Sequence, residues 1–134
     1  MMIPEDLRYS EEHEWVRGNG GGTVEIGITH FAQDQLGDIV YVEIPAVGSQ
    51  MSRGGTFGVV ESVKTVSDLF APVDGEVVET NPRLVESNDA YDPELINRDP
   101  YGEGWMVKVK LKDASQLDDL LDHSGYAKVV EEES

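Results

Sequence analysis

Short runs in which apolar and polar residues alternate predict a mainly β protein. In the clearest run, residues 104–112, every second residue from Trp105 to Leu111 is apolar, and lysines stand at positions 108, 110 and 112. A period of two is typical of a strand with one buried and one exposed face. Similar signals predict strands at about 14–18, 23–28, 38–44, 56–62, 65–70 and 75–80. We therefore expect two antiparallel sheets, packed as a sandwich or a flattened barrel.

Glycines mark the ends of the predicted elements in the first 40 residues. The glycine-rich run at 18–22 lies between two predicted strands and predicts a flexible hairpin loop. A phosphate-binding loop would lead into a helix, whereas a strand follows here, so nucleotide binding is not indicated. Thr29 can cap a short helix that runs to about Leu36, and Gly37 follows where a helix-ending glycine belongs.

The C-terminal part predicts two further short helices. Asp113 or Ser115 can cap the first, in which leucines at 117, 120 and 121 share one face. Ser124 can cap the second, which carries Tyr126 and two valines. We expect this pair, at about 114–131, to close one end of the sheets.

Lys64 lies between two apolar, β-branched runs and is expected at the tip of a hairpin of about residues 56–70. A two-residue hairpin turn normally contains asparagine or glycine, yet neither occurs between Glu61 and Asp68. Such a local departure from turn chemistry is typical of a functional site. An ordinary exposed turn lysine is the alternative interpretation of Val-Lys-Thr taken alone.

Composition limits the possible functions. The 134 residues are expected to form one domain, and no apolar run is long enough to cross a bilayer. The first residues show no export or import signal, so a bacterial cytoplasm is the expected compartment. With 10 basic and 27 acidic residues the formal charge is −17, which argues against binding to nucleic acid or to an anionic membrane. Without cysteine, any redox chemistry requires an attached group.

The residues around Lys64 resemble the lysine hairpin of a known family. Glu61-Ser62-Val63-Lys64, followed by Asp68 and by Ala71-Pro72-Val73-Asp74-Gly75-Glu76, is similar to the lipoyl-lysine hairpin of the glycine cleavage system H proteins. The resemblance covers about residues 9–130. Other matching segments keep the order and spacing of that family: His13-Glu14-Trp15-Val16, Leu36-Gly37-Asp38-Ile39-Val40 and Asp99-Pro100-Tyr101-Gly102-Glu103-Gly104-Trp105.

This resemblance implies a single lipoyl-type hammerhead domain over residues 1–134 and specific roles for four residues. Lys64 would carry lipoate through an amide bond, and Glu61 would be read by the enzyme that attaches it. Glu14 and Asp68 match positions proposed to hold the ammonium of the loaded arm in a cleft. Each of these acids can equally be an ordinary solvated carboxylate.

The resemblance also implies partners. A non-catalytic carrier would receive an aminomethyl group from glycine decarboxylase (P protein) and deliver it to the aminomethyltransferase (T protein). Dihydrolipoamide dehydrogenase (L protein) would then reoxidise the arm. A lipoate ligase, or a lipoyl transferase and synthase, would modify the carrier, which is expected to be a monomer.

Several alternatives remain open. An H-like protein that relays lipoate to other carriers is the closest, whereas a biotin carrier would place methionines beside its lysine, where Val63 and Thr65 stand. A Schiff-base enzyme would need a buried lysine with a lowered pKa, which a hairpin tip does not provide.

Two departures from the family pattern are His30 and the long acidic loop 86–92. The histidines predict no metal site, because His13 and His123 lack ligand spacing.

Overall fold

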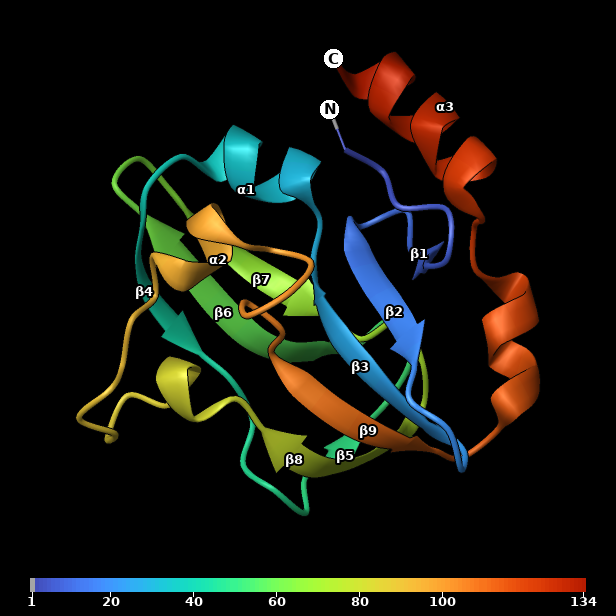
Figure 1. The fold of residues 1–134 in the computed structure, drawn as a ribbon, viewed down its shortest axis with the longest axis horizontal. Coiled ribbons are helices and arrows are strands. Elements are labelled where there is room, and N and C mark those ends of the chain that lie inside the picture. The colour runs from blue at the N-terminus through green and yellow to red at the C-terminus, as the bar shows by residue number, and fades with distance from the viewer. Residues whose placement is uncertain (1) are drawn as a thin grey trace.

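The computed structural model describes residues 2–134 and consists mainly of β-strands (Figure 1). The strands are β1 (Arg8–Tyr9), β2 (Glu14–Gly18), β3 (Thr23–Ile28), β4 (Ile39–Glu43), β5 (Gln50–Met51), β6 (Thr56–Ser62), β7 (Val66–Phe70), β8 (Gly75–Thr80) and β9 (Val107–Leu111). The helices are α1 (His30–Leu36), α2 (Leu95–Arg98) and α3 (His123–Glu133), with 3₁₀ turns η1 (Pro82–Leu84) and η2 (Ala114–Asp119).

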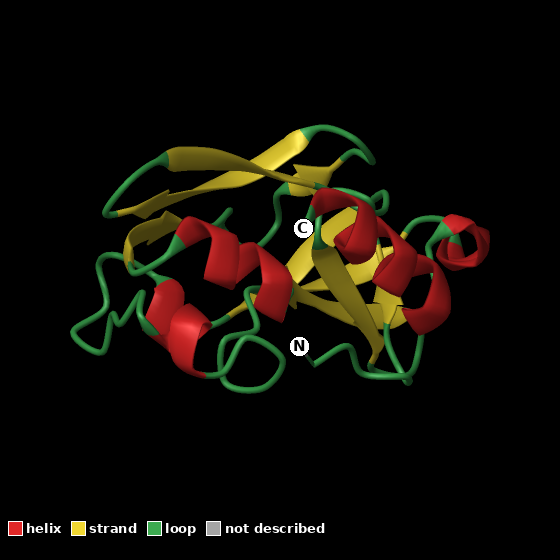
Figure 2. Ribbon diagram, turned by 90° about the horizontal axis from the view of Figure 1, so that it is seen from above, coloured by secondary structure: helices red, strands yellow, loops and turns green. Residues whose placement is uncertain are grey.

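Two antiparallel sheets form the two layers that Figure 2 shows, which confirms the fold predicted from the alternating pattern. One sheet has six strands in the order β1-β2-β3-β9-β8-β5, and the other has three in the order β4-β6-β7. The two-residue strands β1 and β5 were not predicted, because so short a segment carries no readable alternation. The predicted strand at 104–112 is shorter in the structure, since only Val107–Leu111 pairs as β9.

The main core lies between the sheets. Val24 and Ile26 of β3 and Val107 and Val109 of β9 face it from the larger sheet, all at most 1% exposed. The smaller sheet contributes Ile39, Val42, Val60 and Leu69. Because side chains alternate between the two faces of a strand, this burial leaves the hairpin of β6 and β7 with an outer face in contact with solvent.

A second core cluster joins the two ends of the chain. Tyr9 of β1 stacks on Tyr126 of α3 with ring centroids 4.5 Å apart, and Trp15 is fully buried beside them. The indole N–H of Trp15 donates to the carbonyl oxygen of Pro100 at 2.9 Å, so this large side chain is buried without an unpaired donor. The C-terminal helix is thereby packed against β1.

The predicted helix caps are confirmed except at one helix. Thr29 Oγ1 accepts from the Ala32 amide, and Gly37 ends α1 with a φ of 80°. Asp113 caps η2, but this is a 3₁₀ helix that ends at Asp119, so Leu120 and Leu121 lie outside the helix that was predicted to contain them. The prediction that Ser124 caps the last helix is wrong: the cap lies two residues earlier, at Asp122, whose carboxylate accepts from the Gly125 amide at 2.8 Å. A carboxylate is a strong acceptor at a helix N-terminus, where the amides carry partial positive charge.

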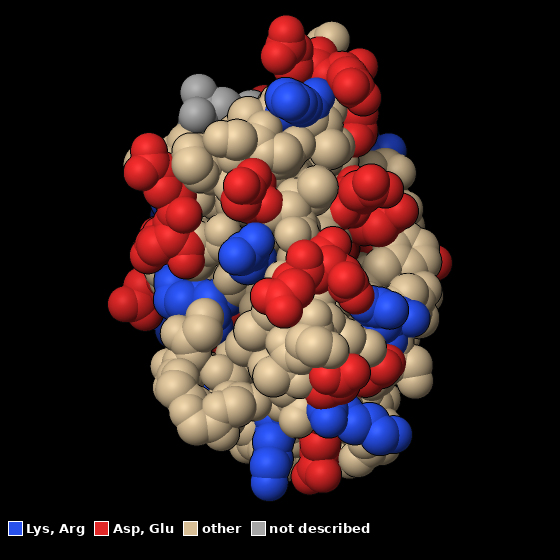
Figure 3. All heavy atoms as spheres, turned by 90° about the vertical axis from the view of Figure 1, so that its right-hand side faces the viewer, with Lys and Arg blue, Asp and Glu red and all other residues tan. Residues whose placement is uncertain are grey.

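The surface is strongly acidic. Figure 3 shows the face on which α3 and η2 lie, where acidic side chains are spread from top to bottom and patches of lysine and arginine lie between them, several of them in the lower half. No helix within residues 2–134 has the length and apolar character needed to cross a membrane.

Candidate functional site

Lys64 stands in the tight turn between β6 and β7 and is exposed. The pairing of Glu61 with Val66 leaves the four residues 62–65 to form the turn, as the hairpin prediction required. The neighbouring Val63 is 69% exposed. The turn therefore holds Lys64 where solvent can reach it.

Ser62 replaces the missing turn glycine. Its hydroxyl accepts from the Lys64 amide at 3.3 Å and from the Thr65 amide at 3.2 Å, and its own amide donates to the Thr65 carbonyl at 2.8 Å. Serine side chains form turns of this kind by hydrogen-bonding the backbone two or three residues ahead. The turn is therefore fixed by a buried hydroxyl, and no glycine or asparagine is needed at its tip.

The turn also contacts the segment that follows α1. The Val63 amide donates to the Asp38 carbonyl at 3.0 Å. The aliphatic part of the Lys64 side chain lies over Gly37, where an added Cβ would be 3.2 Å from Lys64 Cε. The lysine is thus supported by backbone along part of its length, and a side chain at position 37 would displace it.

Asn97 of α2 holds that supporting segment in place. Its amide nitrogen donates to Gln33 Oε1 and to the Gly37 carbonyl, both at 2.9 Å, and its Oδ1 accepts from the Ile39 amide at 2.9 Å. One side chain therefore connects the end of α1 to the start of β4. Sequence reasoning did not identify Asn97, because its partners lie about 60 residues earlier in the chain.

A cleft of about 270 Å³ opens beside this segment. It contains the two acids that the resemblance singled out: Glu14 from β2 and Asp68 from β7 both line it. Leu36, which directly precedes Gly37, lines it as well, so the cleft begins next to the backbone that supports Lys64. Ile28 and Phe31 add apolar surface, and Glu133 of α3 lies at its edge.

Glu14 is the most unusual group in the cleft, because its side chain is only 2% exposed. The Ser10 hydroxyl donates to its carboxyl at 2.6 Å, which partly stabilises the charged form. Burial dominates, however, and raises the pKa of Glu14 to about 8. At neutral pH the carboxyl therefore keeps its proton for most of the time. Asp68 differs, since it is exposed.

His13 forms the rim between the cleft and α3. Its backbone has a φ of 73°, the one positive value among the described residues other than glycine. The ring Nδ1 lies 2.8 Å from the Tyr126 hydroxyl and Nε2 lies 3.0 Å from Glu133. A non-glycine residue in this conformation is strained and is maintained by its surroundings. Sequence reasoning assigned His13 no role, and its contacts hold the C-terminal helix beside the cleft.

The remaining residues that were singled out lie elsewhere. Glu61 pairs with Tyr41 and Val66 in the smaller sheet and does not line the cleft. His30 starts α1, where its amide donates to the Tyr101 hydroxyl at 3.1 Å. Among residues 2–134 no cluster of three potential metal ligands is present.

The acidic loop at 86–92 is anchored to β4. The Tyr91 hydroxyl donates to the Val42 carbonyl and accepts from the Val42 amide, each at 2.8 Å. Asp92 is bound by Arg98 and by Arg83, and these contacts, that of Arg98 first, hold the pKa of Asp92 below its usual range. The loop is thus an ordered part of the surface around the end of β4.

Comparisons with known proteins agree with this arrangement. A family model described as "Glycine cleavage H-protein" matches residues 7–133. A glycine cleavage system H protein from Carboxydothermus hydrogenoformans is 53% identical over 132 residues, which are 98% of this chain and 97% of that protein. One from Symbiobacterium thermophilum is 56% identical over 124 residues, 92% of each chain. The crystal structure of a glycine cleavage system H protein from Mycobacterium marinum is similar with a TM-score of 0.82 and 43% identity, covering 94% of this chain and 97% of that one.

Proposed function

The chain belongs to the glycine cleavage H-protein family, and on that premise we propose that it is a non-catalytic carrier with lipoate amide-linked to Lys64. The observation that carries this proposal is the exposed amine of Lys64, which lies over Gly37 beside a cleft with two carboxyl groups. The amide bond would remove the charge of the lysine, so Lys64 serves as an attachment point and not as an acid or base.

The residues of the site fit a lipoyl group. The apolar surface from Ile28, Phe31 and Leu36 suits an aliphatic chain, and the cleft lies within reach of an arm that starts at Lys64. When bound, the lipoyl group would supply a cyclic disulfide that opens reductively, so that one sulfur carries the aminomethyl group between enzymes and the other becomes a thiol. The cleft would shield the loaded arm from water between visits.

Glu14 and Asp68 would hold the ammonium of the loaded arm. Asp68 offers a carboxylate at the exposed side of the cleft, and Glu14 a buried carboxyl. A nearby cation favours the charged form of an acid, so an entering ammonium would lower the pKa of Glu14 from about 8 and release its proton to solvent. The resulting ion pair would be strong because water is largely excluded there.

The proposed partners are glycine decarboxylase, the aminomethyltransferase and dihydrolipoamide dehydrogenase. Membership of the glycine cleavage H-protein family supports all three enzymes together as partners. Glu61 would be recognised by the lipoate-attaching enzyme, since it lies on the same hairpin, three residues before Lys64. The monomeric state stays a prediction.

Intact mass spectrometry tests the proposal. The protein is incubated with a lipoate ligase, lipoate and ATP, beside a Lys64→Arg variant. A gain of one lipoyl group in the wild type alone would support the attachment site, and an equal gain in the variant would contradict it. The lipoylated protein is then incubated with glycine decarboxylase and glycine: a carrier of the glycine cleavage system accepts an aminomethyl group, and a protein that only relays lipoate does not.

A further inference from the structure

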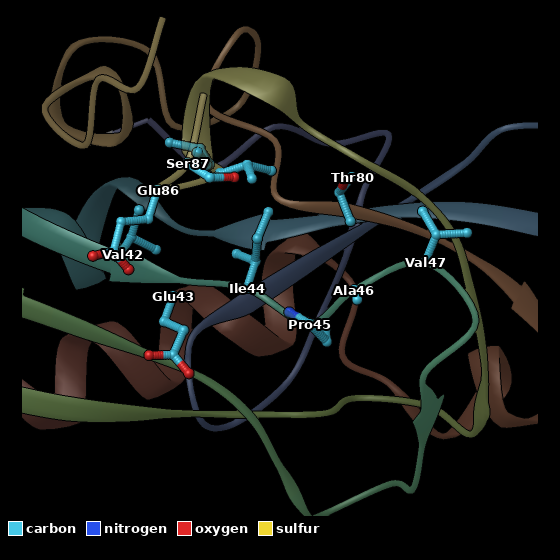
Figure 4. A pocket seen from close by; sticks show the side chains of 11 residues that line it. Val42, Glu43, Ile44, Pro45, Ala46, Val47, Thr80, Glu86 and Ser87 are labelled. Carbon is cyan, nitrogen blue, oxygen red and sulfur yellow. The ribbon is translucent and has the colours of Figure 1, made fainter. Parts of the chain in front are cut away.

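A larger hollow lies at the other end of β4, away from the turn. It has a volume of about 660 Å³ and runs between the segment 42–47 and the segment 84–87, with Thr80 at the end of β8 between them (Figure 4). We call it the β4 groove. None of the residues assigned above to the arm or its cleft lines it.

The β4 groove has an apolar end and an acidic end. Figure 4 shows Ala46 and Val47 at one end and the carboxylates of Glu43 and Glu86 at the other. Val47 is 61% exposed, one of the few large hydrophobic side chains so open to solvent. Apolar side chains beside a polar rim are typical of a surface that binds another protein.

The acidic end lacks positive charge. The Tyr41 hydroxyl lies 2.8 Å from Glu43 and 3.1 Å from Glu86, but a phenol has one hydrogen and can donate to only one of them. Within residues 2–134 neither glutamate has a lysine or arginine partner, whereas Glu25, Glu79 and Asp119 each have one and Asp92 has two. The two carboxylates are therefore complementary to an incoming guanidinium or ammonium.

The groove and Lys64 are separate along the smaller sheet. Ile39 at the start of β4 pairs with Ser62 of the turn, and Glu43 at its end pairs with Val59. At roughly 3.3 Å per residue, Glu43 lies about 10 Å along the sheet from the turn, and Ala46 and Val47 lie beyond it. A short segment bound in the groove would therefore not need to cover the lysine.

We propose that the β4 groove docks a segment of a partner enzyme in which an arginine or lysine stands close to an aliphatic residue. The cation would lie between Glu43 and Glu86, and the aliphatic side chain would cover Ala46 and Val47. This inference rests on the proposed carrier function, because it assigns the segment to one of the three enzymes that the arm visits. Docking away from the arm would hold the enzyme near the hairpin while Lys64 and its attached group remain free to move.

Binding measurements on a Lys64→Arg background, which excludes any contribution of the arm, test the groove. The affinity for each of the three purified enzymes is measured at low and at raised salt for Glu43→Lys, for Val47→Asp and for the control Glu131→Lys. Glu131 is an exposed acid on α3, outside the groove, and its replacement makes the same change of charge. Thermal unfolding and circular dichroism establish that each variant is folded, and Glu43→Gln and Val47→Thr replace any variant that is not.

At least one enzyme should bind each groove variant about tenfold more weakly, while the control changes affinity less than about twofold. The effect of Glu43→Lys should shrink at raised salt, and that of Val47→Asp should shrink less. If the groove variants and the control variant bind the enzymes with equal affinity, the proposal that the groove docks a partner is wrong, while the carrier function is not affected. Failure of the Lys64→Arg parent to bind any of the enzymes would also overturn docking in the groove, whereas failure of the lipoylated wild type to bind any of them would overturn the carrier function as well.

Discussion

The side chain of Lys64 passes so close to Gly37 that a Cβ on the glycine would lie 3.2 Å from Lys64 Cε and 3.8 Å from Nζ. Gly37 also has a φ of 80°, a conformation that side chains other than glycine rarely adopt. Gly37 therefore ends α1 and, because it has no side chain, also leaves space for the side chain of Lys64.

Replacement of Gly37 by alanine should disturb both the end of α1 and the position of the Lys64 side chain. We expect a loss of about 1–2 kcal/mol in the free energy of unfolding from the positive φ, and slower lipoylation because Lys64 is displaced. Denaturant unfolding and mass spectrometry of the ligase reaction measure the two effects. Gly18→Ala is the matched control, since nothing lies within 4 Å of its added Cβ and its φ is not positive; similar losses in both variants would contradict this explanation.

The hydroxyl of Ser62 should prove essential to the rigidity of the turn. Ser62→Ala removes the acceptor of the Lys64 and Thr65 amides and should lower stability by about 1–2 kcal/mol. Hydrogen exchange at these two amides should become faster. In Ser67→Ala, whose hydroxyl makes only a 3.4 Å contact with the next carbonyl, exchange at the turn should stay unchanged.

Glu14 should make the protein less stable as the pH rises. The pKa of Glu14 is raised from 4.5 to about 8 on folding, so between these values the unfolded chain binds fewer protons than the folded one. Stability is then full below about pH 4.5 and falls as the pH rises towards 8, by up to about 1.4 kcal/mol per pH unit.

Glu14→Gln should remove this pH dependence, whereas Glu131→Gln on exposed α3 should keep it. Unfolding experiments across this pH range provide the comparison. A carbon NMR titration that places the midpoint of the Glu14 carboxyl near 4.5 would show that burial does not perturb it.

Asn97 should control the position of the lysine from a distance. Asn97→Ala breaks three hydrogen bonds that join α1 to β4 and should cost about 2–3 kcal/mol. Gly37 would then become mobile, so the rate of lipoylation should fall as well. Asn88→Ala, in which an exposed side chain makes one local bond to the Ala90 amide, should change neither quantity appreciably.

The features that were predicted correctly depend on neighbouring residues. The alternation around Val107 and Val109, the Thr29 cap and the turn at Lys64 are all encoded within a few positions of the chain. Such patterns follow from the geometry of one strand or one helix end. The order in which the strands pair within a sheet cannot be inferred from such local patterns.

Most of the features that were missed depend on residues distant in the sequence, and the Ser62 turn is the exception. The place of Asn97 beside Gly37 requires the folded chain, and so does the burial that alters the pKa of Glu14. The Ser62 turn is local, and its signal was a serine two residues before Lys64. The resemblance singled out Glu14 and Asp68, and the structure places both at the cleft, while their roles stay predictions.

The central place of β9 has a consequence for the order in which the protein folds during synthesis. β9 pairs with β3 on one side and β8 on the other, and Thr23 meets Lys110, 87 positions later. Until the ribosome has released that strand, β3 and β8 each present an unpaired edge, while the hairpin of β6 and β7 can already form. We therefore expect a nascent or prematurely ended chain that lacks residues 107–111 to be prone to aggregation, and the lysine turn to form before the larger sheet is complete.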